Sequence, residues 1–251
     1  MQRRIDFNCD LGEGCGHDAA IMPFISSASI ASGGHAGDAA SMRDTVALCL
    51  AHGVAIGAHP SFADREHFGR RELSLSPNAI AKAVARQVEV LAEACMKQGA
   101  RLHHVKPHGA LYNLSARDRR VADAITAAVR AIDRSLLLYG LSGSASTAAA
   151  DAAGLHAVHE VFAERRYEAD GKLTPRDQPD AVIDGVDDAL AQVRTMLREG
   201  SVQARTGERV PLRADTLCLH GDRPDAAVFA RVLHEALVRD GIWIRAPMEA
   251  A

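Results

Sequence analysis

The chain has 251 residues, of which 47% are hydrophobic and 24% are charged, and its formal net charge is −3. The near-neutral charge gives no electrostatic case for nucleic acid or an anionic membrane as a partner. No apolar run approaches the roughly 18 residues that span a bilayer, and the first residues lead into a strand pattern rather than a signal peptide. Five scattered cysteines without a C-x-x-C pair are typical of reduced thiols, so we expect a cytoplasmic protein.

Short apolar runs alternate with longer amphipathic segments along the chain. Strands are predicted at residues 5–9, 29–32, 54–58, 102–105, 136–140, 157–161, 216–219 and 242–244. Helices are predicted at residues 19–25, 39–52, 76–98, 118–132, 145–153, 187–199 and 224–239. Residues 162–179 and 201–213 are rich in charge, Gly and Pro and are predicted as long loops, the second with a hairpin around Thr206 and Gly207.

Seven or eight strand–helix units predict an α/β fold with a parallel sheet covered by helices. This number of units favours a closed TIM-like (β/α) barrel over an open doubly wound sheet. No change in composition marks a domain boundary, so residues 1–251 are predicted to form a single barrel domain. In such barrels the chemistry lies in the loops that follow the carboxyl ends of the strands.

Ionisable side chains follow six of the predicted strands. They are Asp10 and Glu13 after the first strand, His35 and Asp38 after the second, His59 after the third, Lys106, His108 and Tyr112 after the fourth, Glu160, Glu164 and Arg165 at the sixth, and His220 and Asp222 at the seventh. A barrel would bring these loops together around one mouth. Histidine is also frequent, with 12 in the chain, and it is the side chain best suited to proton transfer or metal binding near neutral pH.

Each of these residues also has a structural explanation. Asp10 and Glu13 are placed to end a strand and cap a helix, and Asp38 is equally well placed as a helix N-cap. Any single histidine is as often structural as functional, but four at equivalent strand ends favour function. Lys106 follows an apolar strand directly, where its ammonium would point into the mouth and stabilise an oxyanion or bind a carboxylate.

Two other reaction classes are excluded by their missing motifs. The segment 140–144 follows a strand and precedes a helix, but it lacks the Gly-Lys-Ser/Thr ending of a nucleotide-binding loop. No Gly-x-Ser-x-Gly elbow occurs, and Cys9 and Cys218 lie within strands as expected core thiols. The remaining residues suit acid–base hydrolysis through an activated water, with or without a metal ion. No local spacing selects a set of metal ligands, so metal involvement stays open.

Several motifs of this chain resemble the LamB/YcsF family. They are Asn8–Glu13, His35–Asp38, Gly57–Pro60, Val105–Tyr112, Glu160–Ala163, Pro175–Arg176, Val210–Thr216 and His220–Asp222. They occur in the expected order over nearly the whole chain, which makes the resemblance more specific than any one motif. Members of this family form the A subunit of bacterial ATP-dependent 5-oxoprolinases.

The resemblance implies a distorted barrel related to sugar-deacetylase barrels, opening of the 5-oxoproline lactam to L-glutamate coupled to ATP hydrolysis, and partner subunits B and C. The candidate catalytic residues are Asp10, Glu13, His59, Lys106, His108 and His220, and the candidate substrate-binding residues are His35, Asp38, Tyr112, Glu160, Arg165 and Asp222. We expect ATP to be handled mainly by the partners, because this chain has no recognisable nucleotide loop. Replacing Lys106 or His108 by alanine is expected to abolish turnover and leave the fold intact.

Two alternative functions remain. One is a stand-alone metal-dependent deacetylase or amidohydrolase on the same barrel, which would need a tightly bound metal and no ATP. The other is a non-catalytic regulatory protein that binds a small acid, although its polar mouth argues against this because binding pockets are mainly apolar. The chain departs from the family pattern at Glu164, where an aspartate is expected, and at Ser32 and Gly34, where a cysteine and an aromatic residue are expected.

Overall fold

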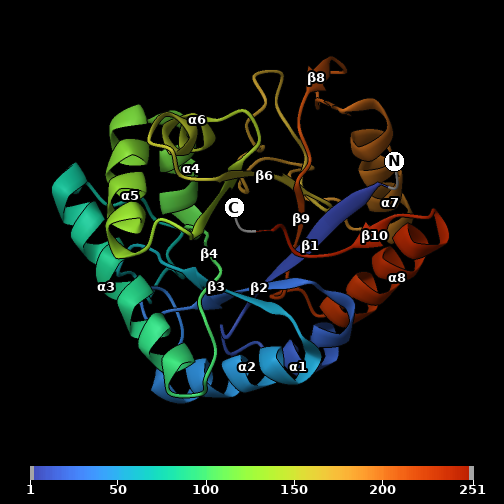
Figure 1. Cartoon of the computed structure of the whole chain (residues 1–251). Helices are drawn as coiled ribbons and strands as arrows, with labels where there is room; N and C mark the ends of the chain where they lie inside the picture. Colours follow the sequence, from blue (N-terminus) through green and yellow to red (C-terminus); the bar gives the residue numbers. More distant parts are fainter. Residues whose placement is uncertain (1–2, 249–251) are drawn as a thin grey trace.

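Seven parallel strands close into a barrel in the computed structural model, which describes residues 3–248 (Figure 1). The strands are β1 (Arg4–Leu11), β2 (Ser27–Ala31), β3 (Ala55–His59), β4 (His104–Val105), β5 (Leu137–Leu141), β6 (Ala157–Phe162) and β9 (Thr216–His220). They pair in that order, and β9 pairs with β1 to close the ring. An eighth strand, β10 (Trp243–Ile244), pairs with the beginning of β1. The predicted TIM-like barrel of seven or eight strands is therefore confirmed.

Helices surround this barrel (Figure 1). They are α1 (Asp18–Ile21), the 3-10 turn η1 (Met22–Phe24), α2 (Ala39–His52), α3 (Pro77–Met96), α4 (Gly109–Arg117), α5 (Arg119–Ile132), α6 (Ala145–Ala152), α7 (Val186–Glu199) and α8 (Ala226–Arg239). Between α7 and β9 the chain forms an antiparallel hairpin of β7 (Ser201–Gln203) and β8 (Arg209–Pro211), which confirms the predicted hairpin. None of the helices described is long and apolar enough to cross a membrane.

Two sequence predictions were wrong in detail near β4. No helix was predicted between the strand ending at residue 105 and the helix starting at residue 118, but residues 109–117 form α4, which buries Ala110, Leu111, Tyr112 and Ser115. This helix starts directly after the polar residues 106–108 and is only nine residues long, so its apolar positions are too few to show a clear helical period in the sequence. The strand itself spans only two residues, His104 and Val105, rather than four. His103 lies just before it, and its ring bonds the carbonyl of Pro247.

Side chains alternate between the two faces of β1. Ile5, Phe7, Cys9 and Leu11 belong to the apolar core, whereas Asp6, Asn8 and Asp10 make polar contacts inside the barrel. The carboxylate of Asp6 accepts a hydrogen bond from Tyr139 on β5, on the opposite side of the ring, at 2.9 Å. A contact between opposite strands must cross the barrel interior, so this interior is polar and continues into the mouth.

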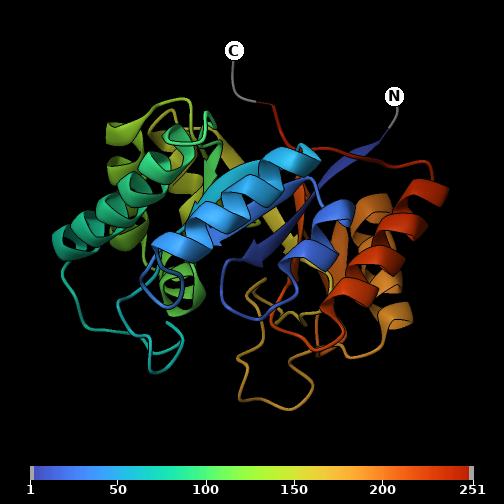
Figure 2. The same ribbon diagram turned by 90° about the horizontal axis from the view of Figure 1, so that it is seen from below.

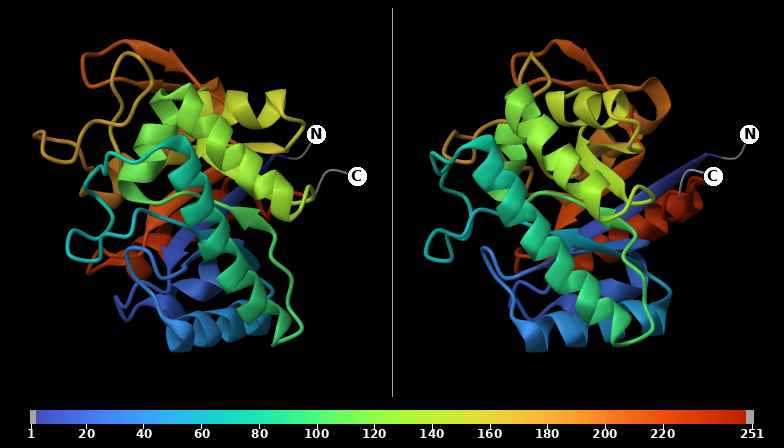
Figure 3. Two further views of the ribbon diagram at one scale, coloured as in Figure 1. Left: turned by 90° about the vertical axis from the view of Figure 1, so that its left-hand side faces the viewer. Right: turned by 60° about the vertical axis from the view of Figure 1, so that its left-hand side comes forward.

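The long loops lie at one end of the barrel. Residues 60–76, between β3 and α3, and residues 163–185, between β6 and α7, extend away from the end where the two termini lie (Figures 2 and 3). Both loops follow the carboxyl end of a strand. They therefore wall in the strand ends where the sequence placed its ionisable side chains.

Candidate active site

The ammonium group of Lys106 is enclosed by acceptors at the barrel mouth. Its Nζ lies 2.7 Å from Asp10 Oδ1, 2.8 Å from Glu160 Oε1 and 2.9 Å from Asn8 Oδ1. The sulfur of Cys218 lies 3.1 Å from the same nitrogen. We call these four residues around Lys106 the ammonium cage. They come from β1, β6 and β9, so the cage links strands from both ends of the sequence.

The cage keeps its central groups charged. Burial alone would lower the pKa of Lys106, but the negative charges around it, chiefly Asp10, hold that pKa well above its ordinary value. Burial likewise opposes ionisation of Asp10, yet His59 and Lys106 hold the pKa of this carboxyl well below its usual range. Because three oxygens already surround the ammonium, Lys106 acts on the cavity through its charge rather than through a free N–H group.

Three histidines gather around Glu13 beside the cage. Glu13 Oε1 lies 2.8 Å from His35 Nε2, 3.5 Å from His108 Nδ1 and 3.9 Å from His59 Nε2. The rings of His35 and His108 stack with centroids 3.6 Å apart and an interplanar angle of 3°. Burial lowers the pKa of His35 to about 3 and lowers the pKa of His108 well below its ordinary value, so both rings are neutral near pH 7.

Backbone geometry in two loops positions His108. Gly109 has φ +56°, and a Cβ atom there would lie 2.6 Å from the carbonyl oxygen of Gly69, so only glycine allows the two loops to touch. Phe68 has φ +53°, a left-handed conformation that is uncommon for a bulky residue. Its carbonyl accepts a hydrogen bond from His108 Nε2 at 2.9 Å. The strained conformation at Phe68 thus aims an acceptor at the imidazole.

A carboxylate orients the remaining imidazole. Glu164 Oε1 forms a hydrogen bond with Nδ1 of the His220 ring. The same oxygen also accepts a hydrogen bond from the backbone N–H of His220 at 3.2 Å. Burial would raise the pKa of Glu164, but the adjacent imidazole outweighs it and leaves that pKa below its ordinary value. The ring of His220 also stacks on Phe162, with centroids 5.6 Å apart. His220 is therefore held with one nitrogen on Glu164 and the ring at the cavity wall.

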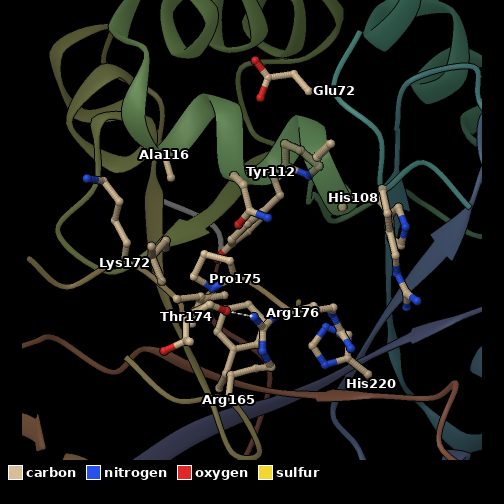
Figure 4. A pocket seen from close by; sticks show the side chains of 18 of the residues that line it. Glu72, His108, Tyr112, Ala116, Arg165, Lys172, Thr174, Pro175, Arg176 and His220 are labelled. Carbon is tan, nitrogen blue, oxygen red and sulfur yellow. Dashed lines mark hydrogen bonds between the residues drawn. The ribbon is translucent and has the colours of Figure 1, made fainter. Parts of the chain in front are cut away.

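A cavity of about 580 Å³ opens beside these groups (Figure 4). Its lining includes Asp10, His59, Lys106, His108 and His220 together with four cationic side chains, Arg70, Arg165, Lys172 and Arg176. Arg165 donates to the carbonyls of Thr174 and Ala181, at 2.6 and 3.3 Å, and therefore braces the loop after β6. Burial lowers the pKa of Arg165 to about 10, which still leaves it charged near neutral pH. The cavity is thus suited to an anionic ligand.

All the predicted site residues except Asp38 and Asp222 belong to the ammonium cage, to the cluster of histidines around Glu13 or to the cavity wall. Tyr112 lies in the wall, where burial and the charge of Glu160 raise its pKa well above its ordinary value. Asp222 does not line the cavity but forms an ion pair with Arg70, which does. Asp38 instead accepts hydrogen bonds from the backbone N–H groups of Ala40 and Ser41 and caps α2, which is its structural alternative.

Sequence reasoning missed four residues of this site. Asn8, two residues before Asp10 on the same strand, shares its inward face, so the period-two pattern contained that information. Arg70 and Arg176 lie in irregular loops, where no periodicity indicates which side chain faces the cavity. Arg176 belongs to one of the family motifs, but the motif alone did not mark it as a site residue. Phe68 contributes its carbonyl and its backbone conformation, neither of which can be read from residue type.

Comparisons with known proteins agree with this geometry. A profile of the LamB/YcsF family matches residues 5–251. The A subunit of 5-oxoprolinase from Bordetella pertussis is 55% identical over 251 residues, covering 98% of this chain and 100% of that protein. The crystal structure of the lactam utilization protein from Thermus thermophilus has a TM-score of 0.91 and 44% identity, covering 97% of this chain and 100% of that one. The resemblance read from the motifs is confirmed.

A more distant solved structure shares only the fold. The family 4 carbohydrate esterase from Streptomyces lividans, in complex with acetate, has a TM-score of 0.52 at 13% identity, covering 96% of this chain and 91% of that one. This similarity agrees with the expected relation to sugar-deacetylase barrels. At such low identity it carries no statement about activity.

Proposed function

Because this chain belongs to the LamB/YcsF family, we propose that it is the A subunit of an ATP-dependent 5-oxoprolinase, which opens the lactam of 5-oxo-L-proline to L-glutamate. The observation that carries the proposal is the 55% identity, over 98% of this chain, to a protein named as the A subunit of 5-oxoprolinase. The geometry supports it independently, since a charged lysine and an oriented imidazole meet at one cavity. Both groups are suited to hydrolysis of an unstrained amide.

The substrate carboxylate has a matching subsite. Arg70 and Arg176 line the cavity, and Arg70 already holds a carboxylate, that of Asp222. A guanidinium binds a carboxylate through two parallel N–H groups, so a lactam bearing one carboxylate fits this side. A five-membered ring fills only part of about 580 Å³, which leaves room for a water molecule and a phosphoryl group.

His220 is the proposed general base. Its Nδ1 is bonded to Glu164, which leaves Nε2 to take a proton from water as the water oxygen bonds to the lactam carbonyl carbon. Breaking the ring C–N bond then releases the amine of glutamate, which takes up a proton. The fixed ammonium of Lys106 opposes the negative charge that develops in this step.

ATP and the partner subunits complete the proposed reaction. Phosphorylation of the amide oxygen would make the ring carbon easier to attack. Water addition and cleavage of the ring C–N bond would then leave an acyl phosphate of glutamate, which a second water molecule would hydrolyse to glutamate and phosphate. We assign the phosphorylation mainly to subunits B and C, because the sequence of this chain has no nucleotide-binding loop. An ATP-dependent reaction and five free cysteines fit the expected cytoplasmic location.

The test is release of phosphate and glutamate from 5-oxoproline, with this chain alone and with subunits B and C. We expect activity only in the mixture, with both products in equal amounts. Arg70→Ala should raise KM for 5-oxoproline, whereas Arg71→Ala, its more exposed neighbour, should not. Activity of the chain alone on acetylated sugars, without ATP, would instead support the deacetylase alternative.

A further inference from the structure

Two buried imidazoles face each other at the cavity wall. His59 Nε2 lies 2.9 Å from His108 Nδ1. The far nitrogen of each ring bonds a backbone carbonyl, with His59 Nδ1 at 2.7 Å from Lys106 O and His108 Nε2 at 2.9 Å from Phe68 O. A carbonyl only accepts, so both far nitrogens carry the N–H of their ring. In neutral rings, therefore, both facing nitrogens present lone pairs.

Facing lone pairs at this distance repel each other unless a proton or a metal cation lies between them, and Asp10 Oδ2, 3.3 Å from His59 Nε2, adds a negative charge beside the same gap. A third donor atom points at the same place, because Glu13 Oε1 is 3.5 Å from His108 Nδ1 and 3.9 Å from His59 Nε2. The side chains of all three residues are at most 6% exposed, so bulk water does not separate them. They come from the loop after β1, the end of β3 and the start of α4, so the fold brings three donors to one point.

We propose that Glu13, His59 and His108 bind a divalent metal ion of the zinc class. Two imidazoles and one carboxylate are a donor set that such ions prefer. A tetrahedral zinc ion with bonds of about 2.0–2.1 Å holds its ligand atoms roughly 3.3 Å apart. The three observed separations, 2.9, 3.5 and 3.9 Å, bracket that value. The backbone carbonyls behind both rings are the outer partners that metal-binding histidines commonly have.

His35 positions the carboxylate ligand. Its Nε2 lies 2.8 Å from Glu13 Oε1, whereas its buried Nδ1 has no hydrogen-bond partner among residues 3–248. An unsatisfied buried N–H is costly, so the proton resides on Nε2 and is donated to Glu13. Three protein ligands then leave one tetrahedral position for water or substrate, which is the pattern of catalytic zinc sites. His59 and His108 both line the cavity, as this pattern requires.

Metal binding by these side chains does not depend on which amide is the substrate. Only the role of the ion rests on the proposed function: a bound divalent ion would polarise the lactam carbonyl or lower the pKa of a water molecule.

The test measures metal binding directly on the full chain, stripped with a chelator and then loaded with Zn²⁺ or Co²⁺. We expect about one ion per chain by elemental analysis after gel filtration, and the visible absorption of tetrahedral Co²⁺. Glu13→Gln, which keeps the size of the side chain, and His108→Ala should each weaken Co²⁺ binding by at least about tenfold. His156→Ala, which removes an exposed histidine between α6 and β6, is the control and should bind like the wild type.

Two results would overturn the proposal. One is a wild-type chain that retains no stoichiometric metal, in which case a proton shared by His59 and His108 occupies the gap and gives a far-downfield imidazole signal in NMR. The other is equal Co²⁺ affinity in Glu13→Gln, His108→Ala and His156→Ala, with circular dichroism showing all three folded. Since the assay contains neither ATP nor lactam and uses this chain by itself, failure of the proposed function would leave this measurement unaffected.

Discussion

The ammonium of Lys106 lies 2.8 Å from the carboxylate of Glu160, and both side chains are at most 2% exposed. The same ammonium also faces Asp10, so one buried cation is paired with two buried carboxylates. Removing one partner of a buried ion pair leaves an uncompensated charge, which typically destabilises a protein by about 3–5 kcal/mol. The structure therefore revises the expectation that Lys106→Ala would leave the fold intact.

We expect Lys106→Ala to unfold at a clearly lower urea concentration than the wild type, and Glu160→Gln added to it to recover part of the loss. Equilibrium urea unfolding followed by circular dichroism measures both. Lys82→Ala, which removes a lysine on the outer helix α3, is the control. An unchanged unfolding midpoint for Lys106→Ala would show that the cage does not hold the barrel together.

Glu164 is a positioning residue for His220. Glu164→Gln should lower kcat by at least about tenfold with little change in KM, because acid–base groups contribute about 10²–10⁴-fold and the imidazole loses its orienting charge. Glu164→Asp should restore most of the rate, since it keeps the carboxylate. Steady-state kinetics of the reconstituted complex decide the matter. Equal rates for the Gln and Asp variants would assign Glu164 a purely structural role.

The contact between Glu164 and His220 also gives a prediction for how stability depends on pH. The pKa of Glu164 is lower in the folded chain than its ordinary value of 4.5, so this carboxylate stabilises the fold above that pH. The contribution is lost as the pH falls through the folded pKa. Melting temperatures measured from about pH 7 to about pH 3 should therefore fall more steeply in the wild type than in Glu164→Gln. Parallel curves would contradict this.

Gly109 allows the loops after β3 and β4 to touch. Gly109→Ala should reduce activity strongly, because its Cβ would meet the carbonyl of Gly69 and displace His108. Gly99→Ala is a matched control, since Gly99 also has a left-handed φ, at +70°, but its Cβ would meet no atom within 4 Å. Both variants carry the left-handed penalty of about 1–2 kcal/mol, so the difference between them measures the clash. Similar activity in both would rule the loop contact out.

Asp38 caps α2, so its replacement should affect stability and not turnover. Asp38→Ala removes the hydrogen bonds to Ala40 and Ser41 and should lower the melting temperature by a few degrees. KM and kcat of the reconstituted complex should stay at wild-type values. A raised KM in Asp38→Ala would show that Asp38 contributes to substrate binding after all.

The sequence predicted the fold well because each strand and most helices carry their own local signals. Gly53 and Gly200, for example, end α2 and α7 in the left-handed conformation that glycine favours. The strand-end rule then located most of the site, because barrel topology alone brings such residues together. Asp38 is the exception. It follows a strand as the other candidates do, but its side chain caps the helix that comes next, α2.

The rest of the site depends on tertiary contacts. The sequence suggested that the Lys106 ammonium would be free to bind an oxyanion, but the three acceptors around it come from strands distant in sequence. The same is true of Arg70 and Arg176, whose loops have no repeating pattern. The surroundings of these three side chains depend on how distant strands and loops pack together. The local sequence around each residue does not determine that packing.

The polar interior of the barrel has a consequence for how the chain folds. Asn8 hydrogen-bonds Thr216, 208 residues later in the chain, and the cage around Lys106 also needs Cys218. Until β9 has been synthesised and docked, the lysine and its carboxylates have no complete partner set and the ring is open. Contacts this distant in sequence form slowly. The contacts around Lys106 are therefore complete only when β9 closes the ring, so a chain that lacks β9 lacks part of the candidate site.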